Sequence, residues 1–315
     1  MTDSYPVELV APDITPYCAG NTGLDYVTTF DSGRAGPHVM IAAVTHGNEL
    51  CGAITLDFLF RREFRPRRGK LTFAFNNFRA FLNFDPEHPL LSRFVDEDFN
   101  RLWSPEVLDG PRTSAELERA RELRPLIDEV DLLLDIHSMQ TSIAPLMLAG
   151  PLEKGRDLAR GLGYPVHVVS DEGHAAGRRL RDYGEFRDPS SEKNALLVEC
   201  GQHWETASAE VSLQTALRFL KACDAVELDQ LEPHITPAPE AQTFIEVTDA
   251  ITIKTIAFEF VEPYYGLEVI PNAGTVLGRD GDEEVRTPHD NCVLIMPSRR
   301  LHPGHTAVRL GRFIH

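Results

Sequence analysis

The segment HVMIAAVTHGNE, residues 38–49, decides the fold because it joins a short apolar run to a cluster of polar side chains. The run His38 to Val44 ends at Thr45-His46-Gly47, which is typical of a short buried strand followed by a turn. Leu50 to Arg62 follows with the apolar spacing of a helix. A buried strand followed by a helix is typical of an α/β protein.

The first two thirds of the chain repeat this alternation of strand and helix. Further strands are expected at Lys70–Asn76, Asp131–Ile136, Pro165–Val169 and Ala195–Glu199, and further helices at Thr113–Val130, with Ser114 as its N-cap, and Glu205–Ala222. Short apolar strands separated by helices predict a sheet buried on both faces. We therefore expect residues 1–225 to form an α/β domain, with a mixed central sheet flanked by helices on both faces.

The sequence changes in character near residue 225. Leu231 to Glu240 is rich in proline and suits a linker, and β-type runs separated by turn signals follow it. These runs are Phe244–Val247, Thr252–Phe260, Asn291–Met296 and Thr306–Leu310. Residues 226–315 are therefore expected to form a smaller β-rich C-terminal domain.

Composition excludes several classes of function. The chain has 315 residues, with 31 Lys and Arg against 48 Asp and Glu, and a net charge of −17 disfavours binding to nucleic acid or anionic membranes. Five widely spaced cysteines without a CxxC motif indicate a reducing compartment, and neither a signal peptide nor an apolar run long enough to span a membrane is visible. We expect a cytoplasmic protein, leave a homo-oligomer open, and note that an acidic substrate would need a local arginine cluster.

Two histidines and a glutamate lie where strands are expected to end. His46 and Glu49 follow the first strand with His-x-x-Glu spacing, and His137 ends the strand Asp131–Ile136. Sites in open α/β sheets gather at the carboxyl ends of strands, and a catalytic zinc site combines such ligands with an open position for water. The set predicts a hydrolytic zinc site. The alternatives are a surface histidine beside a helix-start glutamate, and a histidine satisfied beside the core.

Glu199 ends the apolar strand Ala195–Glu199 and is followed by Cys200-Gly201. A carboxylate at such a place is costly to bury without a purpose or a partner. One interpretation is a general base for a zinc-activated water; the other is a structural glutamate paired with an arginine. The segment Arg93 to Arg101 places two arginines and an asparagine around an acidic patch. Arginine binds carboxylates through its planar fork, although an ordinary charged loop is the alternative.

Taken together, these motifs resemble those of the succinylglutamate desuccinylase/aspartoacylase family, within the zinc carboxypeptidase-like superfamily. His46-Gly47-Asn48-Glu49 is similar to its first zinc motif, Asp135-Ile136-His137 to its second, and Val198-Glu199-Cys200-Gly201 to its catalytic glutamate segment. Arg93 to Arg101 is similar to its Arg-x-x-Asp-x-Asp-x-Asn-Arg segment. The stretch Asp280 to Pro297 resembles the desuccinylase branch, so the resemblance covers nearly the whole chain.

The resemblance implies a zinc carboxypeptidase-like fold and a role for each motif residue. His46, Glu49 and His137 would bind one Zn²⁺ per chain and leave a position for water. Glu199 would be the general base and later the general acid.

The same resemblance implies how the substrate is held. Arg93 would polarise the scissile carbonyl and stabilise the oxyanion, and Asn100 and Arg101 would bind a substrate carboxylate. Tyr183 and Arg187 have the four-residue spacing of a Tyr and Arg that contact substrate in aspartoacylases. The alternative for this last pair is an arginine-rich surface loop.

One departure bears on the substrate. The stretch Ser298 to His305 lacks the tyrosine that aspartoacylases place in the C-terminal domain, which argues against N-acetylaspartate. The roles of His174, His302 and His305 are left open.

The sequence therefore predicts a zinc-dependent amidohydrolase that hydrolyses the amide bond of an N-acyl amino acid or a related small carboxylate. The alternatives are a metallocarboxypeptidase acting on a short peptide and a non-catalytic small-molecule-binding protein that kept the fold. The intact set of metal and base residues argues against the second alternative.

Overall fold

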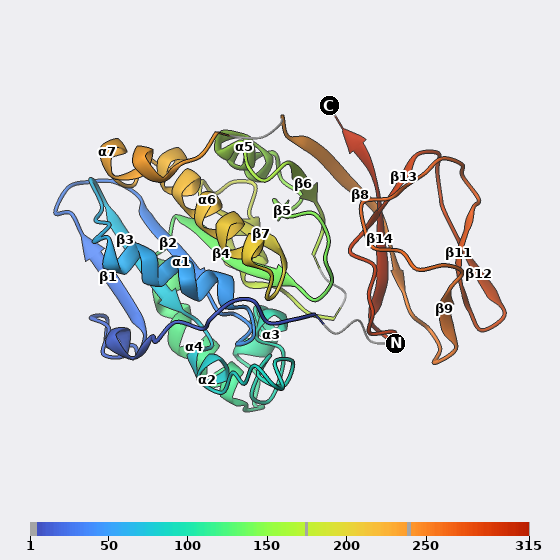
Figure 1. Ribbon diagram of the computed structural model, residues 1–315, viewed down its shortest axis with the longest axis horizontal. Helices are drawn as coiled ribbons and strands as arrows, with labels where there is room; N and C mark the ends of the chain where they lie inside the picture. The colour runs from blue at the N-terminus through green and yellow to red at the C-terminus, as the bar shows by residue number, and fades with distance from the viewer. Residues whose placement is uncertain (1–4, 174–175, 238–240, 315) are drawn as a thin grey trace.

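A computed structural model describes residues 5–173, 176–237 and 241–314, and it confirms the α/β fold with a mixed central sheet (Figure 1). The strand and helix predicted on either side of His46 are β2 (His38–Ala43) and α1 (Leu50–Arg61). Alternate residues of β2 enter two different cores, with Ile41 on one face of the sheet and Met40 on the other. The all-apolar run therefore reflects burial on both faces.

The central sheet has eleven strands within the described residues, in the order β1-β3-β2-β4-β7-β5-β6-β8-β14-β13-β10. The strands β3, β2, β4 and β7 run parallel to one another, whereas β1 and β5 pair antiparallel with β3 and β7. Besides β2, the strands that precede the C-terminal part are β1 (Val27–Asp31), β3 (Lys70–Phe75), β4 (Leu132–Met139), β5 (Leu146–Leu148), β6 (His167–Ser170) and β7 (Asn194–Gln202).

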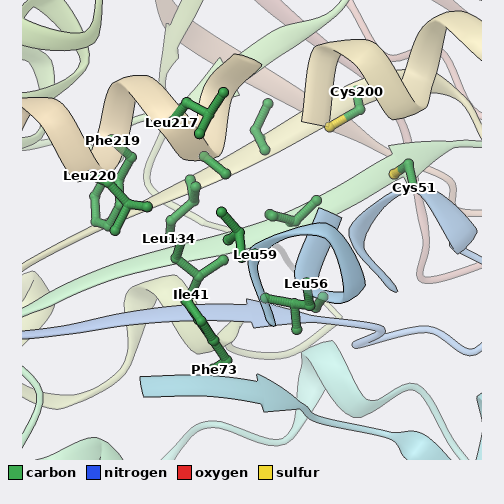
Figure 2. Packing of buried hydrophobic residues seen from close by; sticks show 14 of the residues in the cluster. Ile41, Cys51, Leu56, Leu59, Phe73, Leu134, Cys200, Leu217, Phe219 and Leu220 are labelled. Atoms are coloured by element: carbon green, nitrogen blue, oxygen red, sulfur yellow. The ribbon is translucent and has the colours of Figure 1, made fainter. Parts of the chain in front are cut away.

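Helices cover both faces of this sheet, as predicted. On one face α1 packs beside α6 (Thr206–Ala222), and side chains such as Leu56, Leu217 and Phe219 meet Ile41 and Leu134 of the sheet (Figure 2). On the other face lies α4 (Ala115–Asp128), whose N-cap Ser114 accepts a hydrogen bond from the backbone N–H of Leu117 at 3.0 Å. The remaining α-helices are α2 (Phe78–Leu82), α3 (Pro105–Leu108), α5 (Glu153–Leu162) and α7 (Leu228–Leu231).

The C-terminal part continues the central sheet and adds a second one. Strand β8 (Thr243–Thr252) pairs parallel with β6, and β14 (Thr306–Ile314), β13 (Cys292–Ile295) and β10 (Val269–Ile270) follow it. A separate three-stranded sheet is formed by β9 (Phe258–Phe260), β11 (Val276–Asp280) and β12 (Glu283–Arg286) (Figure 1). The β-rich character is confirmed, and the domain boundary at residue 225 stays a prediction.

The structure differs from the expected elements in a few places. The run Thr252–Phe260 is divided between β8 and β9, because the Asp280 carboxylate accepts the backbone N–H groups of Lys254 and Thr255 and holds a turn there. The short strands β1 and β5 and the helix α5 were not predicted; β1 and β5 lack a long apolar run, and α5 is strongly charged. No described helix is long and apolar enough to cross a membrane.

Candidate active site

The ends of three neighbouring parallel strands carry the predicted metal and base residues. His46 follows β2, His137 lies near the end of β4, and Glu199 lies on β7 directly opposite His137 in the strand register. Glu49 is the N-cap residue of α1, which starts beyond the turn after β2. Because β2, β4 and β7 are adjacent and parallel, their carboxyl ends deliver these side chains to one edge of the sheet.

His46, Glu49 and His137 form a buried cluster whose candidate ligand atoms all lie within 4.8 Å of one another. The Glu49 carboxylate is the centre of it: Oε1 lies 2.7 Å from Nδ1 of His46, and Oε2 lies 3.0 Å from Nδ1 of His137. Burial alone would raise the pKa of Glu49, but the two imidazoles hold it well below its usual value. The three side chains thus form one coupled electrostatic unit.

The far nitrogens of both imidazoles face aspartates. Nε2 of His46 lies 2.9 Å from Oδ1 of Asp98, and Nε2 of His137 lies 2.9 Å from Oδ2 of Asp135, in an orientation that does not make a hydrogen bond. An Nε2–H that donates to Asp98 leaves Nδ1 of His46 with a free lone pair toward Glu49. Metal-binding histidines are typically oriented by a carboxylate on their other nitrogen. The Nδ1 atoms of His46 and His137 and the Glu49 carboxylate, all buried, fit a zinc ion.

Glu199 lies beside this cluster and is not neutralised by a partner. Its side chain is buried, the residue being only 9% exposed, and Oε2 makes no hydrogen bond. Burial raises the pKa of Glu199 to about 8, with Glu49 acting in the same direction and His137 opposing it. The structural alternative, a glutamate in an ion pair with an arginine, is absent within the described residues. A carboxyl group with a pKa near neutrality suits proton transfer.

Arg93 reaches the same cluster from a loop between α2 and α3. One terminal nitrogen lies 3.1 Å from Oδ2 of Asp98, and the other lies 3.7 Å from Oε1 of Glu49. Asp98 therefore binds Arg93 and His46 together, with its pKa held well below the usual value by these neighbours despite burial. The acidic patch next to Arg93 serves in part to hold that arginine.

The loop is fastened to the first turn of α4. The fully buried Glu116 carboxylate accepts the backbone N–H groups of Val95, Asp96 and Glu97 at 2.6, 3.0 and 3.2 Å, and Nδ2 of Asn77 at 3.0 Å. In return, the Asp96 carboxylate accepts the backbone N–H of Ala115 at 2.7 Å. Glu116 was not predicted as a site residue, because nothing in its local sequence distinguishes it from the other glutamates of this charged helix.

The site opens into a cavity of about 550 Å³, which is within the usual range for a small-molecule site. Six arginines line it, although the whole chain is strongly acidic. They are Arg93, Arg101, Arg179, Arg299, Arg300 and Arg309. The expected local arginine cluster is therefore present, and it gives the cavity the charge that an anionic ligand requires.

Asn100 and Arg101 both line this cavity, whereas Tyr183 and Arg187 do not. Tyr183 is buried against Trp103 and donates to the Asp128 carboxylate at 2.7 Å, and Arg187 pairs with Glu172 at 2.5 Å at the surface. The structure does not bring this last pair to the site. The four-residue spacing of Tyr183 and Arg187 could not reveal this. Tyr183 follows the turn Leu180–Asp182, which directs its ring into the core on the same face of the sheet as Met40.

Of the three histidines left open, His305 lines the cavity and contacts the ring of His302, whereas His174 lies outside the described residues. The sequence reasoning missed Arg179 and Arg309 as cavity residues. The only signal for Arg179 was the arginine-rich stretch after residue 177. Arg309 lies between Val308 and Leu310 in the buried part of β14, where a charge is unusual.

Comparison with known proteins places the chain in a family. The succinylglutamate desuccinylase/aspartoacylase catalytic domain matches residues 35–226. Solved structures with the same fold include a succinylglutamate desuccinylase from Vibrio cholerae, with 18% identity, TM-score 0.68, and coverage of 92% of this chain and 86% of that one. A succinylglutamate desuccinylase from Vibrio parahaemolyticus shows 16% identity, TM-score 0.67, and coverage of 92% and 87%.

A third similar structure is the ectoine utilization protein EutE (DoeB) from Ruegeria pomeroyi, solved with bound product, with 15% identity, TM-score 0.61, and coverage of 90% and 88%. A search of curated proteins finds none that matches this sequence. The match to the catalytic domain spans more than half of the chain, and the metal cluster and Glu199 lie inside it. The chain therefore belongs to the succinylglutamate desuccinylase/aspartoacylase family, whose members are hydrolases that act on amides.

Proposed function

We propose that this protein is a zinc-dependent deacylase that hydrolyses the amide bond of an N-acyl amino acid or a related small carboxylate. The observation that carries the proposal is the buried Glu199 carboxylate, which keeps an unpaired oxygen beside the His46, Glu49 and His137 cluster in one cavity. A binding protein would gain nothing from such an uncompensated group. A hydrolase needs it as a base.

Each residue of the cavity has a task in this reaction. His46, Glu49 and His137 would hold zinc, which supplies positive charge at the scissile carbonyl and makes water more acidic. Glu199 takes the proton of the attacking water at its carboxylate and then donates it to the departing amine.

Two further groups handle the charge of the substrate. Arg93 donates from its guanidinium to the carbonyl oxygen as negative charge develops there. Asn100 and Arg101, at another part of the cavity wall, bind a carboxylate of the substrate and so orient the amide.

The dimensions of the cavity support a small substrate over a peptide. Residues 296–300 and Arg309, all from the C-terminal part, line the same cavity as the catalytic residues, so this part of the chain restricts the space for a ligand. The metallocarboxypeptidase alternative is therefore second. The cytoplasmic location and a homo-oligomeric state stay predictions of the sequence.

A hydrolysis screen on metal-quantified protein tests the proposal. The substrates are N-acetyl, N-formyl and N-succinyl amino acids beside a short peptide series, each assayed with and without a chelator. We expect chelator-sensitive release of a free amine from one of the acyl amino acids. Cleavage confined to the peptides would favour the carboxypeptidase, and protein that holds zinc but releases no amine from any compound would contradict the deacylase.

Replacement of Glu199 by Gln tests the assigned base. The variant keeps the volume of the side chain but accepts no proton, so kcat should fall about a hundredfold to ten-thousandfold while one metal per chain is retained. Metal content by elemental analysis and kcat from amine release are the two measurements. Activity within a fewfold of wild type would remove Glu199 from the mechanism.

A further inference from the structure

Arg309 is a buried cation that the C-terminal strand β14 contributes to the catalytic cavity. It lines the cavity and is only 7% exposed. Its one ion pair within the described residues is a loose contact of 3.5 Å between Nε and the Asp171 carboxylate. Among the residues that the structure describes, none forms a hydrogen bond with its terminal nitrogens, so the two-pronged end of the guanidinium is available to a ligand.

Asp171 cannot neutralise Arg309, because it is already engaged by Arg179. Both terminal nitrogens of Arg179 donate to the Asp171 carboxylate, at 3.0 and 2.6 Å, and its Nε donates to Asp182 at 2.6 Å. Asp182 is shared in turn with Arg181 at 2.6 Å. Three arginines thus share two aspartates, and this buried group keeps one positive charge in excess.

Arg101 adds a second positive charge that forms no ion pair within the described residues. Its guanidinium donates to the backbone carbonyl of Asn100 at 2.7 Å, and within the described residues no carboxylate lies within ion-pair distance of it. Burial lowers the pKa of Arg101 to about 10; the Asp98 carboxylate opposes this change, and the positive charges of Arg93, Arg179 and Arg309 act in the same direction as burial. Arg101 and Arg309 line the same cavity, where their positive charges repel each other.

A buried cation and a half-buried cation that repel each other are costly in an empty cavity, and the pair becomes favourable when an anion lies between them. We propose that Arg309 and Arg101 jointly bind one carboxylate of the substrate, so that a residue of the β-rich C-terminal part determines specificity for an anionic substrate. This rests on the proposed function. Asp171 is the positioning residue, since its contact with Arg309 is to Nε and not to the two terminal nitrogens.

Substitution of Arg309 by Gln tests the carboxylate directly. The probes are the best acyl amino acid of the hydrolysis screen and the analogues in which each carboxylate in turn is replaced by a carboxamide. We expect kcat/KM for the acid to fall about tenfold to a hundredfold, mainly through KM. One carboxamide analogue, the one that lacks the carboxylate bound by Arg309, should already be a poor substrate of wild type. For this analogue, kcat/KM should differ less than about threefold between wild type and Arg309→Gln.

Arg312→Gln is the matched control, because Arg312 lies on the same strand but is exposed and pairs with Glu246. Its kinetics should equal those of wild type on every probe. Equal losses for Arg309→Gln on the acid and on all its carboxamides would show a structural role and overturn the proposal, as would an unchanged KM for the acid. Arg309→Lys, which keeps the charge and loses the fork, guards against misfolding and should show a smaller loss with the same selectivity.

A binding measurement separates this proposal from the proposed function. N-succinyl-L-glutamate is titrated into wild type and Arg309→Gln with thermal unfolding as the readout, which needs no turnover. The ligand should raise the unfolding temperature of wild type. The apparent affinity derived from this shift should be at least tenfold weaker for the variant. Such a difference without hydrolysis of any acyl amino acid would reject the deacylase and keep the anion site. Equal stabilisation of both proteins would reject the anion site.

Discussion

The catalytic cavity has two walls that are built in different ways. The first carries His46, His137 and Glu199 on the ends of neighbouring parallel strands, so backbone hydrogen bonds hold each side chain in register with the next. The second carries Arg101, from the segment between α2 and α3, and Arg309, from the last strand, and both line the cavity. The first wall is specified by the sheet, and the second by charges that only folding brings together.

This difference predicts how each wall fails. A side chain removed from the first wall leaves the sheet intact and removes chemistry, because β2, β4 and β7 do not depend on it for pairing. An aspartate removed from the supports of the second wall leaves a buried arginine without a partner. Changes in these supports should therefore affect stability and substrate affinity together.

The largest effect is expected from the first wall. His46→Ala should lose the bound metal and lower kcat/KM at least about a thousandfold, because a metal supplies several kcal/mol of charge stabilisation. The matched control is His38→Ala, a buried histidine of β2 whose Nε2 lies 2.7 Å from Oγ1 of Thr72. His38→Ala should lose stability but keep one metal per chain. Full metal occupancy in His46→Ala, measured by elemental analysis, would break the assignment of the first wall.

A smaller effect is expected at the support of the Arg93 loop. Glu116→Gln replaces one acceptor oxygen by an N–H donor that faces backbone N–H groups, so the loop should loosen and kcat should fall about tenfold, with metal retained. Glu118→Gln, exposed on the same helix, serves as the control. The measurements are kcat from steady-state kinetics and the metal content of Glu116→Gln, Glu118→Gln and wild type. A loss of stability with unchanged kcat would show that the contact shapes the fold and not the position of Arg93.

The smallest effect on catalysis is expected from a change at Asp182, which binds Arg179 and Arg181 behind the second wall. The effect of this change on stability should depend on pH. Burial would raise the pKa of Asp182, but Arg179 and Arg181 lower it from 3.8 to about 2. A carboxyl group whose pKa is lower in the folded than in the unfolded protein stabilises the fold at a pH above its unfolded-state pKa. This stabilisation is lost as the pH falls through the folded-state pKa. Asp182 should therefore contribute on the order of 2 kcal/mol at neutral pH, a contribution that disappears between about pH 4 and pH 2.

Urea unfolding of wild type and Asp182→Asn at pH 7, 5 and 3 checks this expectation. The difference in unfolding free energy between the two proteins should be constant from pH 7 to 5 and smaller at pH 3. Asp282→Asn, at an exposed turn, is the reference for a carboxylate outside the network. A difference that grows toward acid pH would mean that Asp182 is protonated in the folded protein, contrary to its ion pairs.

Most of the first wall could be predicted from the sequence. The strands β2, β4 and β7 appear as short apolar runs, and a polar residue that ends such a run lies at the carboxyl edge of a parallel sheet. The spacing of His46 and Glu49 across one turn adds a second local signal. The β-rich C-terminal part was also predictable. The continuation of the central sheet into β8 was not, because the sequence of neither strand indicates that β6 and β8 pair.

The sequence by itself determined the α/β class and the identities of His46, Glu49, His137 and Glu199, because local patterns of burial place strand ends and strand ends meet at one edge. Only the tertiary structure decided that Arg309 lines the cavity, that Glu116 holds the Arg93 loop, and that Tyr183 and Arg187 lie outside the site. The physical reason is that a hydrogen bond or ion pair between residues far apart in the chain depends on packing, which no local pattern encodes.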